Sequence, residues 1–269
     1  MGSQHFDETY GGTAPENYER FFVPAIGAPL ATDLIRLAAL RPGERVLDVA
    51  CGTGIVARLA SREVGSTGTV AGLDLNPGML SVARSSTSPE ASIEWYEANA
   101  ESMPLPAGAF DVVFCQLGLQ FMPDKLAALR EMRRVLVDDG RLLLNAPGPA
   151  GPVFAILAEA IERHIGAEAA GFVRLVFSLD DASGLEQLAG DAGFCDAAVQ
   201  DETRTLRLPA PKLFFRQYLH STPLAGIVAQ ADEGARAALE RDVVANWQQF
   251  EDGGGMAYRQ AVMLLTARK

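Results

Sequence analysis

A glycine-rich turn between an apolar run and a helix-forming segment places the strongest constraint on how this chain folds. Residues 46–49 form a short apolar run that contains Asp48, and Gly52 and Gly54 follow within five residues. Glycine adopts backbone conformations that other residues avoid, and it lets a ligand approach the main chain closely. The helix predicted over residues 55–62 begins with unpaired N–H groups. The segment is therefore a strand–turn–helix unit at which a ligand can bind.

The pattern that continues from this turn predicts an α/β fold. Short apolar runs alternate with amphipathic helical segments, at residues 45–49, 69–74, 92–97, 111–116 and 141–145. Near-continuous apolar strands of this kind are typical of a parallel sheet that is covered on both faces. Two extended runs follow, at about 195–207 and 257–267. We predict a doubly wound, mostly parallel, seven-stranded Rossmann-like sheet.

The remaining segments divide the chain into four parts. Residues 1–20 are polar and rich in glycine, so we expect them to be mobile, and apolar residues at helical spacing predict a helix over about 25–40. The stretch from 209 to 256 reads as helices rich in aromatic residues, alanine and leucine, which is typical of a binding lid. We predict an N-terminal arm and helix that cover the ligand site (1–40), a core (41–208), a helical lid inserted between the last two strands (209–256) and a final core strand (257–269).

Composition excludes several classes of function. The net charge is −11, so the chain lacks the basic footprint that a nucleic-acid partner requires. The three cysteines are not closely paired, and no His/Cys/Asp/Glu spacing resembles a metal site. The first residues do not resemble a secretory signal, and the apolar stretch from 22 to 40 contains Asp33 and Arg36. We expect a cytoplasmic protein with no membrane span, no metal and no nucleic-acid partner.

Two kinds of ligand compete for the glycine turn. A dinucleotide fold requires G-x-G-x-x-G, in which the last glycine allows close packing around a pyrophosphate. With Gly52 as the middle glycine, the three positions are Ala50, Gly52 and Ile55, and starting the pattern at Gly52 and Gly54 also leaves the third glycine missing. The pattern therefore disfavours a pyrophosphate and favours a ligand with an adenosine and an amino acid but no phosphate.

The turn and the motifs after it resemble those of the class I S-adenosylmethionine-dependent methyltransferases. The first motif of that family is an acidic residue followed by G-x-G-x-G, which here is Asp48 with Ala50, Gly52 and Gly54, so alanine replaces the first glycine. The resemblance is close over about residues 40–146. It is closest to the branch that contains ubiquinone and menaquinone C-methyltransferases and many natural-product methyltransferases.

The resemblance implies S-adenosylmethionine as the cofactor and suggests which residues bind it. A carboxylate at the end of the second strand, Asp74, would accept hydrogen bonds from both ribose hydroxyls. Asn99 stands where the family usually has aspartate, and it would meet the adenine amino group through its side-chain oxygen. Leu75 and Met79 would sandwich the adenine. The predicted cofactor-binding residues are Tyr18, Asp48, Ala50, Gly52, Gly54, Asp74, Leu75, Met79, Asn99, Ala100, Glu101 and Gln116.

The sequence indicates the methyl acceptor less specifically than the cofactor. We predict a small, apolar or aromatic metabolite that contacts Phe22, Gln120, Tyr218 and Trp247, with His220 as the candidate general base. The identity of the acceptor, the atom that is methylated and the oligomeric state are open, and a homo-oligomer is compatible with the sequence. A non-catalytic S-adenosylmethionine-binding regulatory or partner protein is the alternative, and an NAD-dependent oxidoreductase comes third.

Overall fold

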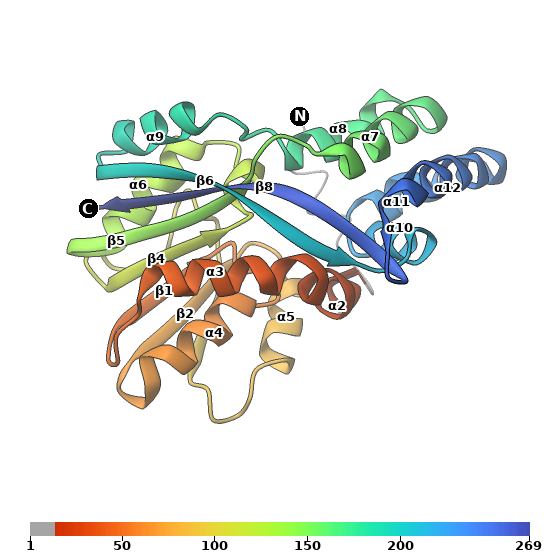
Figure 1. Ribbon diagram of the computed structural model, residues 1–269. Coiled ribbons are helices and arrows are strands. Elements are labelled where there is room, and N and C mark those ends of the chain that lie inside the picture. Colours follow the sequence, from red (N-terminus) through yellow and green to blue (C-terminus); the bar gives the residue numbers. More distant parts are fainter. Residues whose placement is uncertain (1–13) are drawn as a thin grey trace.

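The computed structural model describes residues 14–269 as a central mixed sheet flanked by helices (Figure 1). The strands run in the order β3-β2-β1-β4-β5-β8-β6, and β7 pairs with β8. The pairs from β3 to β5 are parallel, whereas β8 is antiparallel to both of its neighbours. The predicted doubly wound Rossmann-like sheet is therefore confirmed. The strands are β1 (Arg45–Val49), β2 (Thr69–Asp74), β3 (Ile93–Glu97), β4 (Phe110–Gln116), β5 (Leu136–Pro147), β6 (Cys195–Leu208), β7 (Glu251–Asp252) and β8 (Gly255–Arg268).

The central strands are apolar on both faces because each face is covered by helices. Val46 and Leu47 of β1 are fully buried and pair with Val112 and Val113 of β4. Successive side chains of a strand point to opposite faces. Val46 and Val112 accordingly enter one hydrophobic cluster, and Leu47 and Val113 enter the other.

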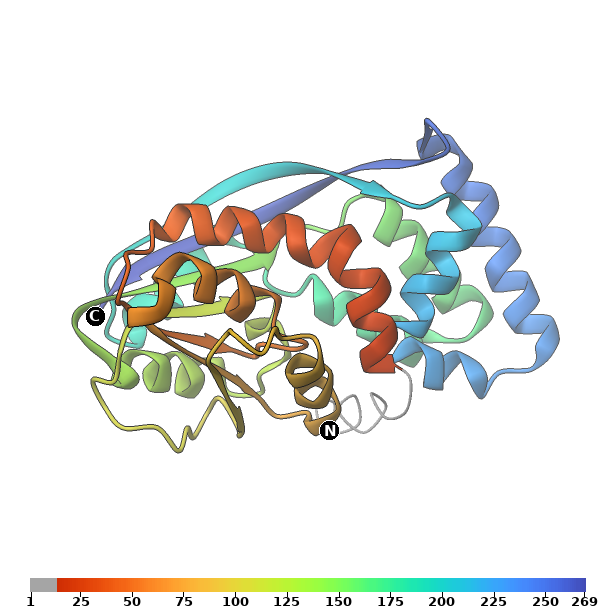
Figure 2. The ribbon, with the colours of Figure 1, turned by 90° about the horizontal axis from the view of Figure 1, so that it is seen from below.

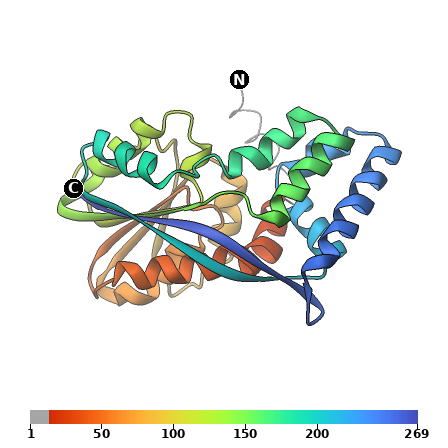
Figure 3. The same ribbon diagram turned by 45° about the horizontal axis from the view of Figure 1, so that its top comes forward.

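Helices form a layer on each side of the sheet (Figures 1 and 3). On one side lie α3 (Ala28–Ala38), α4 (Ile55–Val64) and α5 (Pro77–Ser85), and on the other lie α6 (Lys125–Val135) and α9 (Ala182–Asp191). Polar side chains cap the starts of three of these helices: Asn76 accepts from two N–H groups of α5, Asp124 accepts from Ala127 N of α6, and Asp181 accepts from Ser183 N of α9. These caps place the start of α5 at the carboxyl end of β2.

The N-terminal helix is longer than the sequence predicted. It runs continuously from α2 (Ala14–Asn17) through the π-helical η2 (Tyr18–Gly27) into α3 (Figure 2). Residues 14–20, which we expected to be mobile until something orders them, are helical, and residues 1–13 lie outside the described part of the chain. Tertiary contacts explain the extra turns: the Ser221 hydroxyl donates to Asn17 O, and Glu19 pairs with Arg58. Packing of this kind stabilises helical turns that local composition does not predict.

This helix is the one described helix that is long and apolar enough to cross a membrane, by length and composition alone. Half of its most apolar window is buried within the fold. Core helices and signal sequences meet the same criteria.

A helical cap lies beyond the carboxyl ends of the parallel strands (Figure 3). It consists of α7 (Pro152–His164), α8 (Ala167–Val176), α10 (Pro211–His220), α11 (Leu224–Ala229) and α12 (Glu233–Trp247). The helices expected between the last two strands are present, but α7 and α8, which the sequence placed with the core, pack against α12 and α11. Sequence periodicity did not predict α8. The long strands β6 and β8 pair as far as Leu208 and Met256, so they connect the sheet to the cap.

Two glycines make room for one tryptophan, and this gives a test of the packing beside the turn. A Cβ on Gly54 or on Gly72 would lie 2.4 Å from the Trp95 ring, but only Gly54 also has a left-handed backbone, with φ +84°. We expect Gly54→Ala and Gly72→Ala each to lower the free energy of unfolding by roughly 1–3 kcal/mol. In a Trp95→Leu background the clash with the ring is removed, so Gly72→Ala should lower the free energy of unfolding much less. Gly54→Ala should still lower it, because alanine is strained in the left-handed backbone at this position. Urea unfolding of the single and double variants measures this, and equal recovery at both positions would contradict it.

Candidate functional site

The glycine turn after β1 is a left-handed loop at the carboxyl edge of the sheet. Ala50, Gly52 and Gly54 have φ values of +54°, +54° and +84°. The Cys51 N–H donates to Leu73 O of β2 (3.0 Å), which ties the loop to the neighbouring strand. Ala50 therefore keeps the backbone that the family's first glycine would adopt, at the small cost that a Cβ brings to this region. The loop leaves no side chain at two of its positions.

Asp74 joins this loop to the end of β2. Its Oδ2 accepts from Gly52 N at 2.7 Å, and its Oδ1 accepts from Asn76 N at 2.9 Å. The carboxylate thus fixes the position of the turn relative to the start of α5. The structure places Asp74 at the carboxyl edge beside the turn, where sequence predicted it. Its contact with a ribose stays a prediction.

Asp48 is buried beneath the turn and is 1 % exposed. Its Oδ2 accepts from Ala57 N in the first turn of α4 (3.0 Å), so it caps the helix that begins at the loop. Burial, together with the charge of Asp74, raises the pKa of Asp48 to about 8, against the favourable effect of the Ala57 hydrogen bond. Asp48 supports the loop from inside, and its Oδ1 is buried without a partner among the described residues.

The residues predicted to hold the adenine lie on two adjacent loops. Asn99 follows β3, and its Oδ1 accepts from Glu101 N at 2.8 Å, which makes a tight turn. Ala100 is buried, and Glu101 Oε1 accepts from Asp124 N. After β2, Leu75 is 50 % exposed, whereas Met79 is buried in α5. These positions fit a flat apolar group lying at the edge of β2 and β3, and the contacts stay predictions.

The N-terminal helix covers the turn. A Cβ on Gly52 would lie 3.8 Å from the Tyr18 ring, and Tyr18 stacks on Phe22 with ring centroids 4.5 Å apart. Burial, together with the charge of Asp74, raises the pKa of Tyr18 well above its ordinary value, so its hydroxyl stays protonated at neutral pH. Tyr18 is thus placed over the glycine turn, as the sequence analysis expected.

An ion pair that the sequence did not reveal fastens this helix to the turn. Arg58 of α4 binds Glu19 (2.7 Å), and its guanidinium also donates to the Thr53 carbonyl within the turn. Both ion-pair partners are largely buried, with side-chain exposures of 12 % and 24 %. Charged residues 39 positions apart carry no local signal that they will meet, so single-sequence reasoning had no means to find the pair.

A chain of amide groups fixes the other end of the same helix. Gln116 at the end of β4 donates to Gly27 O (3.1 Å) and accepts from Asn145 Nδ2 (3.2 Å). Asn145 is fully buried in β5. It was missed, although a polar residue in an otherwise apolar strand was a usable signal. Gln116 therefore contacts the helix that covers the site, and no described contact tests its predicted role with the cofactor.

The predicted acceptor residues occupy different environments. Phe22 and Tyr218 face each other, with ring centroids 6.4 Å apart, between the N-terminal helix and the cap. Trp247 is fully buried, and its Nε1 donates to Val153 O. Packing in the core therefore explains the tryptophan at this position without a substrate contact. His220 is exposed at the end of α10, and its backbone carbonyl accepts from Asn17. Because Phe22 also stacks on Tyr18, the pair of Phe22 and Tyr218 is connected to the predicted cofactor residues.

Four buried side-chain oxygens lack a hydrogen-bond partner within residues 14–269, and all come from segments at this edge of the sheet. Buried polar atoms are normally paired, so each such atom calls for an explanation. A ligand with several donors would satisfy them. They are Glu19 Oε2, Asp48 Oδ1, Thr53 Oγ1 and Gln120 Oε1.

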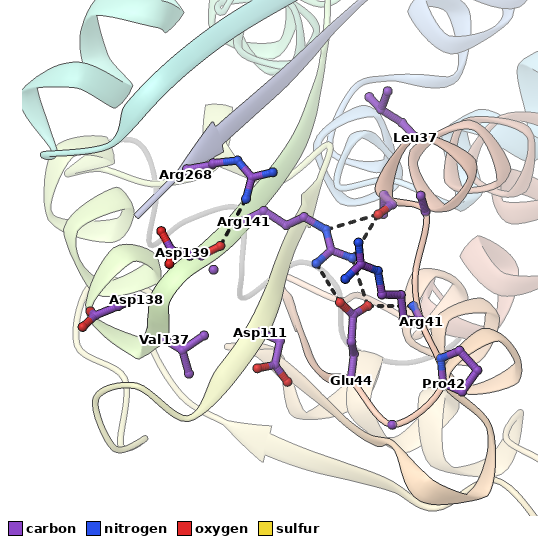
Figure 4. Close-up of a pocket in the computed structure, with 14 residues that line it drawn as sticks. Leu37, Arg41, Pro42, Glu44, Asp111, Val137, Asp138, Asp139, Arg141 and Arg268 are labelled. Atoms are coloured by element: carbon purple, nitrogen blue, oxygen red, sulfur yellow. Dashed lines mark hydrogen bonds and ion pairs between the residues drawn. The ribbon is translucent and has the colours of Figure 1, made fainter.

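A large hollow of about 760 Å³ lies at the opposite edge, at the amino ends of β4 and β5 (Figure 4). Two of its arginines are engaged within the lining: Arg141 binds Glu44 (2.8 Å) and Ala38 O, and Arg268 donates to Asp139 O. Ligands of open α/β sheets bind outside the carboxyl ends of the strands. We therefore assign the functional site to the carboxyl edge.

Comparison with known proteins agrees with this geometry. A family profile described as a methyltransferase domain matches residues 47–144, from the glycine turn to β5. The ubiquinone/menaquinone biosynthesis C-methyltransferases of Xanthomonas campestris and Pseudomonas putida are each 44 % identical to this chain, over 110 and 113 residues. Residues 47–144 are thus similar to class I S-adenosylmethionine-dependent methyltransferases. The matches cover 40 % and 41 % of the chain and only 44 % of each relative, and therefore leave most of the cap unmatched.

Solved structures share the fold over nearly the whole chain. The Haemonchus contortus phosphoethanolamine N-methyltransferase 2, in complex with S-adenosylhomocysteine, matches with a TM-score of 0.63 and 21 % identity over 99 % of this chain and 59 % of that chain. The 4+2 cyclase SpnF matches with a TM-score of 0.55 and 20 % identity over 90 % and 80 %. At such identities the likeness shows the fold alone.

The buried Asp48 predicts how stability depends on pH. Its folded pKa of about 8 lies above the ordinary value of 3.8, so the folded state holds the proton more tightly than the unfolded chain. The free energy of unfolding of the ligand-free protein should therefore fall as pH rises from about 4 to about 8. Asp48→Asn keeps an acceptor for Ala57 N and removes the titration. The melting temperature of this variant minus that of the parent should be small near pH 4 and grow towards pH 8.

Thermal unfolding at several pH values measures this difference. Asp138→Asn, which alters a fully exposed side chain on β5, is the control for a general change in charge. A difference for Asp48→Asn that stays constant with pH, or shrinks as pH rises, would contradict burial of a protonated carboxyl.

Proposed function

We propose that this protein transfers the methyl group of S-adenosylmethionine to a small, apolar or aromatic metabolite at the carboxyl edge of its sheet. One observation carries the proposal. The left-handed glycine turn, the Asp74 carboxylate and three partnerless buried oxygens (Glu19 Oε2, Asp48 Oδ1 and Thr53 Oγ1) lie together at the carboxyl edge, and the fourth such oxygen, Gln120 Oε1, follows β4. A cofactor with ribose hydroxyls, an adenine amino group and an ammonium supplies the donors that such a site requires.

The residues at the turn fit this cofactor. Gly52 has no side chain and its nearest neighbour is the Tyr18 ring, so a ligand can lie against the backbone there, whereas the space beside Gly54 is filled by Trp95. Asp74 would bind the ribose, and its carboxylate, together with the buried carboxyl groups of Asp48 and Glu19, lies where the cationic amino-acid end would bind. Asn99 and Met79 would border the adenine. Tyr18 closes the space above the turn and excludes water from it.

The cofactor supplies an electrophilic methyl carbon bound to a sulfonium, so the protein has to position the acceptor rather than activate the donor. Placement in line with the breaking bond lowers the barrier by several kcal/mol, on the order of what orientation achieves in intramolecular reactions. Phe22 and Tyr218 offer ring faces to an aromatic acceptor. The thiol of Cys115 takes no part, because burial raises its pKa to about 12.

Asp74→Ala tests the cofactor assignment. Loss of hydrogen bonds to a charged group, at about 1.5–3 kcal/mol each, should raise the Kd for S-adenosylhomocysteine at least tenfold. Isothermal titration calorimetry measures the Kd, and circular dichroism checks that the turn still folds. Asp138→Ala removes an exposed carboxylate at the opposite edge and should leave the Kd unchanged. An unaltered Kd in Asp74→Ala would contradict the ribose contact.

Methyl transfer itself separates an enzyme from a non-catalytic binder of the same cofactor. The protein is incubated with S-adenosylmethionine labelled in its methyl group and with an extract of apolar metabolites. We expect label to pass into the organic phase together with S-adenosylhomocysteine formation, and Phe22→Ala to slow the transfer without loss of cofactor affinity. Tight cofactor binding with no product above the protein-free control would favour the regulatory alternative.

Point substitutions are preferable to removal of the cap in these experiments. Phe214, Tyr218 and Trp247 belong to the same buried cluster as Val46 and Val112 of the sheet. Deletion of residues 209–256 would therefore expose the core of the whole domain, and lost activity would have no single cause.

A further inference from the structure

A buried amide oxygen after β4 has no hydrogen-bond partner among residues 14–269. Gln120 lies in η4 (Leu119–Phe121) and is 1 % exposed. Its Nε2 donates to Leu117 O at 2.9 Å, and since a carbonyl oxygen can only accept, this bond fixes which end of the amide is nitrogen. Oε1 is left buried and unpaired. An acceptor buried in this way destabilises the fold unless a donor arrives.

The turn that carries Gln120 is held rigidly. Leu117 has a left-handed backbone, with φ +51°, and its N–H lies within hydrogen-bond distance of both Asn145 O (3.0 Å) and Asn145 Oδ1 (3.1 Å). Gly118 presses against the glycine turn, because a Cβ there would lie 2.6 Å from the Cβ of Ala50. Strained backbone persists where its surroundings fix it, and such sites are often functional. The Gln120 amide therefore stands at a defined place beside the turn.

The chemistry of Gln120 differs from that of the other partnerless oxygens. Glu19, Asp48 and Thr53 lie around the glycine turn, and two of them are carboxyl groups. Gln120 offers a neutral acceptor on the β4 side, and the next residue, Phe121, is 37 % exposed and stacks on Phe172. A neutral acceptor beside an aromatic surface suits an uncharged, mostly apolar molecule with one donor group.

We propose that Gln120 determines acceptor specificity, because its Oε1 accepts a hydrogen bond from a neutral O–H or N–H of the methyl acceptor. This inference rests on the proposed function. It narrows the substrate class to small apolar molecules that carry an uncharged hydrogen-bond donor. Molecules of the same shape without the donor would leave Oε1 buried and unpaired, which is the condition under which a polar site rejects an analogue strongly.

Matched pairs of probes test this assignment in the presence of saturating S-adenosylhomocysteine. The pairs are naphthol against methoxynaphthalene, indole against N-methylindole, and hydroxybenzaldehyde against methoxybenzaldehyde. Titration calorimetry should show that the donor-bearing member of at least one pair binds the parent protein about fivefold or more tightly. In Gln120→Leu the ratio should fall to about one, while the affinity for S-adenosylhomocysteine stays unchanged.

Two further variants serve as a replacement and as a control. Gln120→Met, which is unbranched and of similar length, repeats the measurement in case Gln120→Leu does not fold. Gln249→Leu changes an exposed glutamine near the end of the cap and should keep the parent ratio. No discrimination by the parent in any pair, or the same discrimination in both Gln120 variants, would overturn the inference. If the parent protein did not bind S-adenosylhomocysteine at all, the proposed function would be contradicted instead. A titration of the parent protein with S-adenosylhomocysteine, done before the probes are added, distinguishes this outcome.

Discussion

The hydrogen bond from Gly52 N to Asp74 Oδ2 is the contact on which the rest of the site depends. It joins the turn after β1 to the end of β2, and the second oxygen of the same carboxylate binds the start of α5. The left-handed backbone of Ala50 is costly for an L-amino acid, and it persists because fixed partners hold the loop from both sides. Asp48 supports it from below through Ala57 N. Two acidic residues therefore set the shape of a loop that itself has almost no side chains.

The N-terminal helix completes the site by contacts that are polar at both ends. Glu19 and Arg58 fasten it to the turn, and the Gly27 carbonyl receives Gln116 at the end of β4. Between these points, Tyr18 and Phe22 lie over the loop and towards the cap. A ligand beneath this helix would be shielded from water only while these contacts hold. Access to the site therefore depends on the ion pair between Glu19 and Arg58, which holds this helix over the turn.

Sequence alone predicted the sheet and the turn because their signals are local. Apolar runs and the glycines fixed β1, β2 and β4 to within a residue, and the family motifs placed Asp74 correctly. The helical state of residues 14–20 was not predictable, because it depends on Ser221 and Arg58, which are remote in the chain. Trp247 shows the opposite error: an aromatic residue in an inserted segment suggested a substrate contact, yet it is packed against Val153. Aromatic composition cannot separate packing from binding without the fold.

The distribution of partnerless oxygens divides the site into two chemically different halves. The carboxyl groups of Glu19 and Asp48 lie beside the turn; Glu19 is paired with Arg58, and burial raises the pKa of Asp48, so a nearby cation would favour the charged form of Asp48. On the side of β4 the polar groups are amides, Gln116, Gln120 and Asn145, which bind neutral partners without a change of protonation. A sulfonium cofactor with an ammonium group and an uncharged acceptor are the pair of ligands that this division favours. The arrangement of carboxyl and amide groups thus supports the proposed cofactor and acceptor on grounds that are independent of motif resemblance.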